Sequence, residues 1–178
     1  MSINDSQLTT KANTVVPFLL RTLRKNKFVR ELQPVWVPAD DVQADALKDL
    51  ESGENQLSFW LLDDGLSDLD RLLAGLAANR DQLANLDFAL IPLERIIELG
   101  IRVEDNAGDC LDAEMRLLHR DLAQLTASQL AVLAKTISLH GQLERRSKSQ
   151  VRTLLLNSVA AGYLDVEAMK EGIANKLA

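Results

Sequence analysis

Cysteine and histidine are scarce in this sequence, which has one cysteine and two histidines. Because a disulfide needs two thiols, Cys110 cannot form one within the chain, and a lone cysteine is typical of a reducing compartment. Zinc sites use several Cys and His ligands at short spacing, which His119 and His140 do not supply. The sequence therefore predicts neither a disulfide-stabilised fold nor a zinc site.

Long apolar runs are also missing. No stretch approaches the roughly 18 consecutive apolar residues that a membrane-spanning helix needs. Segment 1–14 is polar and lacks the apolar centre of a signal peptide. We therefore expect a soluble, cytoplasmic protein of bacterial type that makes no contact with a membrane.

Aromatic residues make up only 4% of the sequence, whereas Leu and Ala are abundant, and this favours helix over sheet. The hydrophobic share of 47% and the charged share of 26% are typical of a globular protein. A chain of 178 residues can bury a substantial core, in one domain or two small ones.

Charge is distributed unevenly around the total of −6. The net charge is +4 over residues 1–39, −8 over 40–81, −6 over 82–114 and +4 over 115–178. The acidic middle can therefore pair with the basic ends of the same chain or with another chain. The overall negative charge argues against nucleic-acid binding over the whole surface, although a local basic patch remains compatible with it.

The N-terminal segment 1–13 is predicted to be a flexible arm. Thr14 can cap a helix, and the apolar residues that follow at helical spacing predict a helix over residues 15–27. The sequence PVWVP at 34–38 is bounded by prolines and predicts a short edge strand. A second helix is predicted over residues 41–51.

Two apolar strands are predicted in the middle of the chain, at residues 56–63 and 85–92. The first is apolar on both of its alternating faces, which predicts a central strand covered on both sides. A helix that begins near Ser67 lies between the two strands, so a parallel crossover connection is expected. A short helix at 93–99 and a last strand at 101–105 follow.

The C-terminal part of the sequence lacks strand signals. Apolar residues at alternating spacings of four and three predict one amphipathic helix over residues 111–125. Thr126 and Gln129 form a capping box that starts the next helix. Segment 140–150 is predicted to be a polar break or a frayed continuation of that helix. Two more helices are predicted on either side of a tight connection at Gly162.

These elements predict an α+β fold that is predominantly helical. Its sheet is expected to be small, with three or four mixed or parallel strands joined by crossover helices in the N-terminal half, followed by a helical C-terminal half. We divide the chain into a flexible arm, a small α/β part and a helical part that share one core: residues 1–13, 14–108 and 109–178.

The tetrapeptide HRDL at 119–122 matches the start of a protein-kinase catalytic loop. A kinase also needs a glycine-rich loop and an Asn that binds metal, but no such loop is present and Thr126 stands at the position of that Asn. The sequence therefore favours a helix in which three polar residues lie beside the apolar stripe and face water, the acidic part of the fold or another chain: His119, Arg120 and Asp121.

Four acidic residues follow two of the predicted strands: Asp40, Asp41, Asp63 and Asp64. If the sheet is parallel, these carboxylates lie at the carboxyl ends of the strands, where α/β proteins place their sites. Carboxylates that converge there can bind Mg²⁺ or Mn²⁺ and support hydrolase or nuclease chemistry. Otherwise they are turn and helix-capping residues, and no cofactor is expected.

Two basic clusters lie far apart in the sequence. They are candidate contacts for a nucleic acid or a partner protein, or surface charge that pairs with the acidic middle. The first cluster contains Arg21, Arg24, Lys25 and Lys27, and the second contains Arg145, Arg146, Lys148 and Arg152.

No complete catalytic motif is present in the sequence. Together with segregated charge and long apolar stripes, this favours a non-enzymatic subunit or adaptor of a cytoplasmic assembly, which binds a partner protein or a second copy of itself. A metal-dependent hydrolase or nuclease that uses the four aspartates is the second hypothesis. A nucleic-acid-binding accessory protein that uses the two basic clusters is the third.

Overall fold

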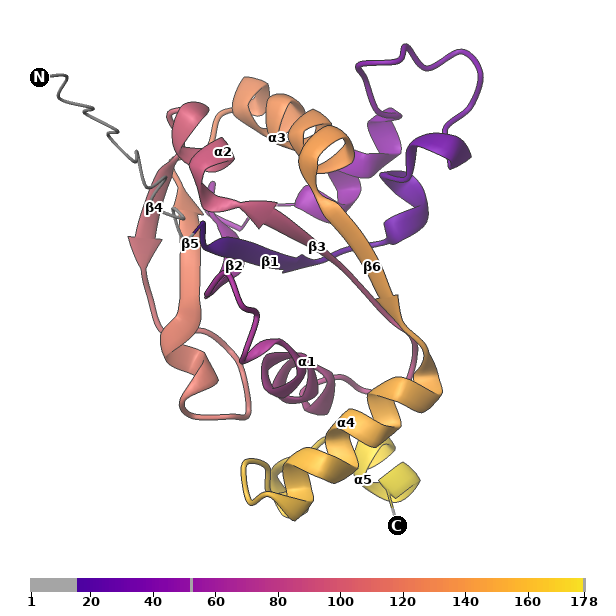
Figure 1. Cartoon of the computed structure of the whole chain (residues 1–178), viewed down its shortest axis with the longest axis vertical. Helices are drawn as coiled ribbons and strands as arrows, with labels where there is room; N and C mark the ends of the chain where they lie inside the picture. Colours follow the sequence, from indigo (N-terminus) through magenta and orange to yellow (C-terminus); the bar gives the residue numbers. More distant parts are fainter. Residues whose placement is uncertain (1–15, 52, 178) are drawn as a thin grey trace, which may run out of the picture.

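One sheet of six antiparallel strands, with helices on both faces, forms the centre of the molecule (Figure 1). A computed structural model describes residues 16–51 and 53–177, so the predicted arm over 1–13 lies outside the described residues. The strands are, in chain order, β1 (Phe18–Thr22), β2 (Leu57–Leu62), β3 (Leu86–Pro92), β4 (Arg102–Asp105), β5 (His119–Ala123) and β6 (Gln142–Arg146). Their order across the sheet is β4-β5-β2-β1-β3-β6.

Strand β1 lies in the interior of the sheet and pairs with a neighbour along each edge. Leu20 is opposite Trp60 of β2 on one side and opposite Leu90 of β3 on the other. Leu19 and Leu20 are both fully buried, because successive side chains of a strand point to opposite faces and both faces of this sheet are covered.

The predicted fold class is wrong, because the sheet has six strands and every pairing in it is antiparallel. Strands β2 and β3 do run in the same direction with a helix between them, but β1 lies between them in the sheet and pairs antiparallel with both. The C-terminal half is not all-helical either, since β5 and β6 pair with β2 and β3.

Helices cover the two faces of the sheet, with α3 on one face and α1 and α4 on the other (Figure 1). The α-helices are α1 (Leu69–Ala78), α2 (Leu93–Glu98), α3 (Ala127–His140), α4 (Lys148–Ala160) and α5 (Glu171–Leu177). The described residues also contain five short 3₁₀ helices: η1 (Lys25–Lys27), η2 (Arg30–Leu32), η3 (Ala44–Leu50), η4 (Met115–Leu118) and η5 (Val166–Ala168). Within the described residues, no helix is long and apolar enough to cross a membrane.

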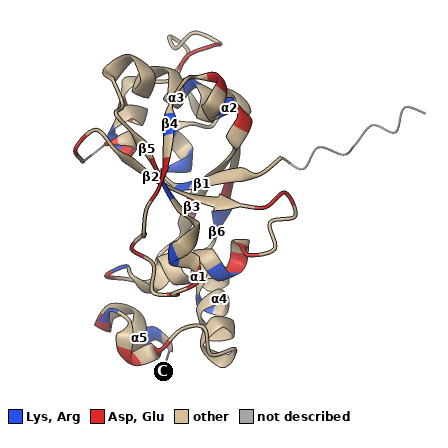
Figure 2. Ribbon diagram, turned by 90° about the vertical axis from the view of Figure 1, so that its left-hand side faces the viewer, with Lys and Arg blue, Asp and Glu red and all other residues tan. Residues whose placement is uncertain are grey.

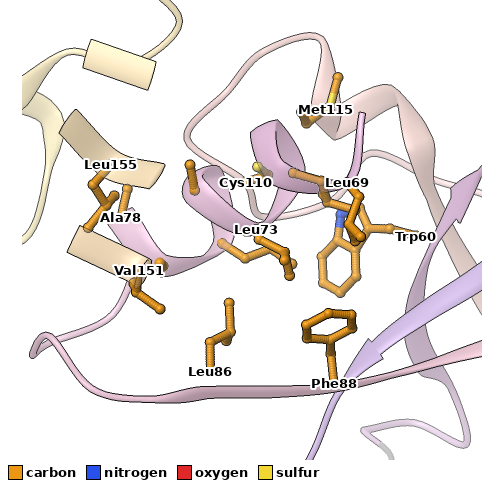
Figure 3. Close-up of a cluster of buried hydrophobic side chains, with 14 of the residues drawn as sticks. Trp60, Leu69, Leu73, Ala78, Leu86, Phe88, Cys110, Met115, Val151 and Leu155 are labelled. Atoms are coloured by element: carbon orange, nitrogen blue, oxygen red, sulfur yellow. The ribbon is translucent and has the colours of Figure 1, made fainter. Parts of the chain in front are cut away.

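The larger core cluster lies between the sheet and helices α1 and α4 (Figure 3). Trp60 and Phe88 project from the sheet toward Leu73 of α1, and Val151 and Leu155 of α4 close the cluster from the far side of α1 (Figure 3). Burial of an aromatic or Leu side chain contributes roughly 1.5–3 kcal/mol, so this cluster is a main source of stability.

The second core cluster lies on the opposite face of the sheet, under α3 and η3. Leu133 and Ile137 of α3 and Leu50 of η3 pack against Leu19 and Phe59 of the sheet. Thr126 and Gln129 form the predicted capping box at the start of α3, which is thereby confirmed.

Three of the predicted helices and strands are wrong. Residues 15–27 form β1 and η1 instead of a helix, and residues 34–38 form turns instead of a strand. The segment 111–125 contains η4 and β5 in place of one helix. In β1 and β5 contacts with distant strands override the local pattern, because adjacent leucines such as Leu19 and Leu20 suit a strand that is buried on both faces. Residues 34–38 pair with no described strand and form turns in which Val35 and Trp36 are exposed.

The other middle elements are confirmed within a few residues at each end. The strands predicted at 56–63, 85–92 and 101–105 correspond to β2, β3 and β4, and the short helix predicted at 93–99 is α2. The polar segment 140–150, predicted to be a break, instead forms strand β6 and the first turn of α4.

Gly75 allows α1 to approach the loop that carries Cys110. A Cβ at position 75 would collide with the Sγ atom of Cys110 and press against Asp112. A helical Gly→Ala change normally stabilises by roughly 0.5–1 kcal/mol. We expect Gly75→Ala instead to lower the free energy of unfolding by about 1 kcal/mol, since overpacking a filled core is costly.

Urea denaturation of a double-mutant cycle tests this packing. In a Cys110→Ala background, where the colliding sulfur is absent, the same Gly75→Ala change should cost much less. A stabilised Gly75→Ala protein, or an equal loss in both backgrounds, would contradict the close contact between α1 and this loop.

Candidate functional site

The segment from the end of η2 to the start of η3 protrudes as a loop from the body of the molecule (Figure 1, indigo). Its three large side chains are unusually exposed: Leu32 at 61%, Val35 at 104% and Trp36 at 75% of their full area. We call these three residues the apolar apex. Exposed side chains of this size, grouped on one loop, are typical of a surface that another molecule covers.

Hydrogen bonds hold the apex loop in a defined shape. Arg30 donates from Nη1 to the carbonyl oxygen of Pro38 at 2.8 Å, which closes the loop across its base. Gln33 donates from Nε2 to the carbonyl oxygen of Lys27 at 2.7 Å and accepts the N–H of Gln43 at 3.1 Å. A loop that is ordered before binding loses less conformational entropy when it binds.

The base of the loop is attached to helix α3. Ser138 donates its hydroxyl to the carbonyl oxygen of Phe28 at 2.7 Å, and the ring of Phe28 is fully buried in the core. Asp41, at the end of the loop, lies 3.4 Å from Lys135 of the same helix. These contacts tie both ends of the loop to the rigid part of the fold.

Acidic residues flank the apex, and Figure 2 shows acidic segments (red) beside the loop at the top of the view. Glu31 and Asp40 are exposed. The backbone N–H of Val42 and the ammonium of Lys135 hold the pKa of Asp41 below its usual value, so this carboxylate stays charged. The apolar apex therefore has an acidic rim.

The four aspartates proposed as a metal site do not lie together. Asp41 contacts α3 on one face of the sheet. Asp63 accepts the backbone N–H and the hydroxyl of Ser67, at 3.0 and 2.8 Å, next to the start of α1 on the other face. Asp40 and Asp64 are exposed, and among the described residues no group of three or more His, Cys, Asp or Glu is placed to bind a metal ion.

The structure brings parts of the two predicted basic clusters together around Asp87. Arg145 donates from Nε and Nη2 to this carboxylate at 2.6 and 2.8 Å, and the backbone N–H of Lys25 donates to it at 3.1 Å. Arg24 binds Asp49 nearby through its own backbone N–H and its Nε, each at 2.7 Å. These contacts follow from the pairing of β3 with both β1 and β6.

An open hollow of about 290 Å³ lies beside these pairs. We call it the basic hollow. Its lining residues come from the end of β1, the end of η3, the end of α1 and the start of β3: Thr22, Leu23, Arg24, Asp49, Arg80, Asn85 and Asp87. Burial lowers the pKa of Arg80, and the charge of Asp87 opposes this effect.

The remaining basic residues make structural contacts. Arg21 is largely buried, donates to the carbonyl oxygen of Ser58 at 2.8 Å, and burial lowers its pKa to about 10. Lys27 donates to the carbonyl oxygen of Asp45 at 2.8 Å, and Arg152 donates to that of Lys176 at 2.9 Å. Arg146, outside the hollow, pairs with Glu144 at 2.7 Å.

His119, Arg120 and Asp121 lie on strand β5 and not on a helix. The His119 ring is buried edge-on against Trp60, with its Nε2 3.7 Å from Asp121. Asp121 also accepts an N–H of Asn106 at 2.8 Å. The side chains of His119 and Asp121 are therefore buried, whereas Arg120, on the other face of β5, pairs with Asp105 at 2.8 Å.

Two features of these surfaces were missed in the sequence. Trp36 lies between two prolines in a segment too short to form a sheet strand without neighbours, and this was the available signal that it is exposed in a turn. Arg80 had no such signal, because its role in the basic hollow depends on strands that are distant in sequence.

No protein-family model, curated protein or solved structure matches this chain.

The carboxylate of Asp87 should make stability depend on pH. The hydrogen bonds from Arg145, aided by the backbone N–H of Lys25, hold the pKa of Asp87 below its usual value. Because the pKa of this carboxyl is lower in the folded than in the unfolded protein, the charged carboxylate stabilises the fold. This stabilisation is fully present above the unfolded pKa of about 3.9 and is lost as the pH falls through the folded pKa. The difference in stability between the wild type and Asp87→Asn should therefore narrow below about pH 4.

Urea midpoints measured from pH 7 down to pH 2 check this dependence. Asp64→Asn is the control, because Asp64 is exposed and makes no hydrogen bond or ion pair with a described residue. If the stability difference between the wild type and Asp87→Asn stays constant down to the lowest pH, the pairing with Arg145 does not stabilise the charged carboxylate.

Proposed function

We propose that the protein is a non-enzymatic subunit or adaptor that binds a partner protein through the apolar apex. The observation that carries this proposal is the exposure of Val35 and Trp36 on a loop held in place by hydrogen bonds. Tryptophan is among the residues most enriched at binding hot spots, where it fills a pocket of the partner. A rigid loop is suited to this role, because little ordering is needed on binding.

The charges around the apex favour a protein partner over a lipid surface. The rim contains Glu31, Asp40 and Asp41. Anionic headgroups would repel these carboxylates, whereas a pocket with basic residues at its edge would attract them. We therefore expect a partner with an apolar pocket and a basic rim.

The metal-dependent hydrolase has less support, because Asp41 pairs with Lys135 of α3 whereas Asp63 binds Ser67 near the start of α1, and Asp40 and Asp64 are exposed.

The double substitution Val35→Ala/Trp36→Ala tests the apex. Both side chains are exposed, so stability should change by no more than about 0.5 kcal/mol. Loss of a hot-spot tryptophan typically costs 2 kcal/mol or more, so binding should weaken by about 30-fold or more. The partner is first identified by pull-down from native lysate, then purified for a measured dissociation constant.

Leu117→Ala/Leu139→Ala is the matched control, since these side chains are 72% and 48% exposed and lie outside the apex. It should bind the partner as the wild type does. Equal affinity of the apex variant and the wild type would contradict the proposal, as would a wild-type protein that stays an unbound monomer at every salt concentration. If the captured protein is a second copy of the chain, the apex variant should be monomeric at concentrations where the wild type is not.

A further inference from the structure

We propose that the basic hollow binds a single phosphate group, carried by a small ligand or present as inorganic phosphate. The proposal rests on a different set of residues from the apolar apex and does not depend on it. Two arginines, Arg24 and Arg80, line the hollow, and their guanidinium groups are the donors that best match phosphate oxygens.

Arg80 is the central residue of this site. Its guanidinium is partly buried at the end of α1, where burial lowers its pKa. Its one hydrogen bond to a described residue is a long contact of 3.4 Å with the carbonyl oxygen of Asn85. Among the described residues, no carboxylate lies within ion-pair distance of it, and Asp87 acts only through longer-range attraction. A partly desolvated guanidinium without a carboxylate partner gains more free energy from binding an anion than a fully solvated guanidinium does.

The two carboxylates beside the hollow are already hydrogen-bonded, so they do not occupy the remaining N–H donors of the arginines. Asp49 accepts the backbone N–H and the guanidinium of Arg24, and Asp87 accepts two guanidinium donors of Arg145 and the N–H of Lys25. Arg24 and Arg145 each use one edge of their guanidinium in these pairs. The pairs hold the two arginines in place and leave the Nη1 group of Arg24, which lines the hollow, without a hydrogen bond to a described residue.

Helix α4 adds positive potential at the same place. The backbone N–H of Lys148, its first residue, donates to the Oδ1 atom of Asn85 at 2.8 Å, so the positive end of this helix lies beside the hollow. Two arginines thus line the hollow, Arg24 and Arg80, and three further basic residues contact its lining residues Asp87 and Asn85: Lys25, Arg145 and Lys148.

The hollow suits one phosphate group better than a nucleic-acid strand. Its lining contains no aromatic ring on which bases could stack. The carboxylates of Asp49 and Asp87 lie at its wall, and the chain as a whole carries a net charge of −6, so a polyanion would meet repulsion outside the site.

Titration of the purified protein with inorganic phosphate, followed by amide NMR shifts, tests this inference. Chloride at matched ionic strength is the reference. We expect a saturable shift of the amides of Arg24, Lys25 and Asn85 with phosphate and no saturation with chloride. Arg80→Gln should raise the dissociation constant by about tenfold or more, because a hydrogen bond between charged groups contributes roughly 1.5–3 kcal/mol.

Arg95→Gln is the matched control, because Arg95 loses the same charge but lies in α2 and pairs with Glu98 at 2.9 Å. It should bind phosphate as the wild type does. Equal shifts with phosphate and chloride would overturn the inference, as would equal dissociation constants for Arg80→Gln and Arg95→Gln. A single-stranded oligonucleotide that binds with steep salt dependence, while phosphate alone does not bind, would also overturn it, in favour of a nucleic-acid surface.

Discussion

Burial of strand β1 on both faces, with a hydrogen-bonded neighbour on each edge, is the constraint on which the rest of the structure depends. Leu19 and Leu20 point to opposite faces and are both fully buried, so each face needs its own layer of helices. Strands β2 and β3 must then lie on either side of β1, and the helix between them crosses the sheet. The η1 segment follows directly after β1. It brings Lys25 next to Asp87, and Phe28, ahead of the apolar apex, accepts a hydrogen bond from Ser138 of α3.

The sequence was sufficient to predict the elements whose partners are close in the chain. The leucines of α1, the apolar strands β2 and β3 and the capping box at Thr126 all carry local patterns that the structure confirms. It was insufficient for β1 and β5, because Leu19, Leu20 and Leu122 fit a helix as well as a strand until their pairing partners are known. Parallel pairing was wrongly inferred because strand–helix–strand order does not reveal that a third strand is inserted between the two.

The candidate surfaces were predictable only in part. The two basic clusters were visible as charge, but their meeting at Asp87 depends on β3 pairing with both β1 and β6. A parallel sheet predicts that the aspartates at the ends of its strands converge. In an antiparallel sheet the ends of neighbouring strands alternate between the two edges, and Asp41 and Asp63 contact helices on opposite faces. The positions of the apolar apex and the basic hollow thus both depend on the place of β1 in the sheet.

Native-state amide hydrogen exchange tests the central position of β1 most directly. A strand paired on both edges and buried on both faces exchanges only when the whole domain unfolds, whereas the outer edges of a sheet open more easily. We expect the amides of Leu19, Leu20 and Arg21 to show the full free energy of unfolding, and outward-facing amides of β4 and β6 to show much less. Exchange in β1 as fast as in these edge strands would contradict the arrangement of the sheet and the placement of both surfaces.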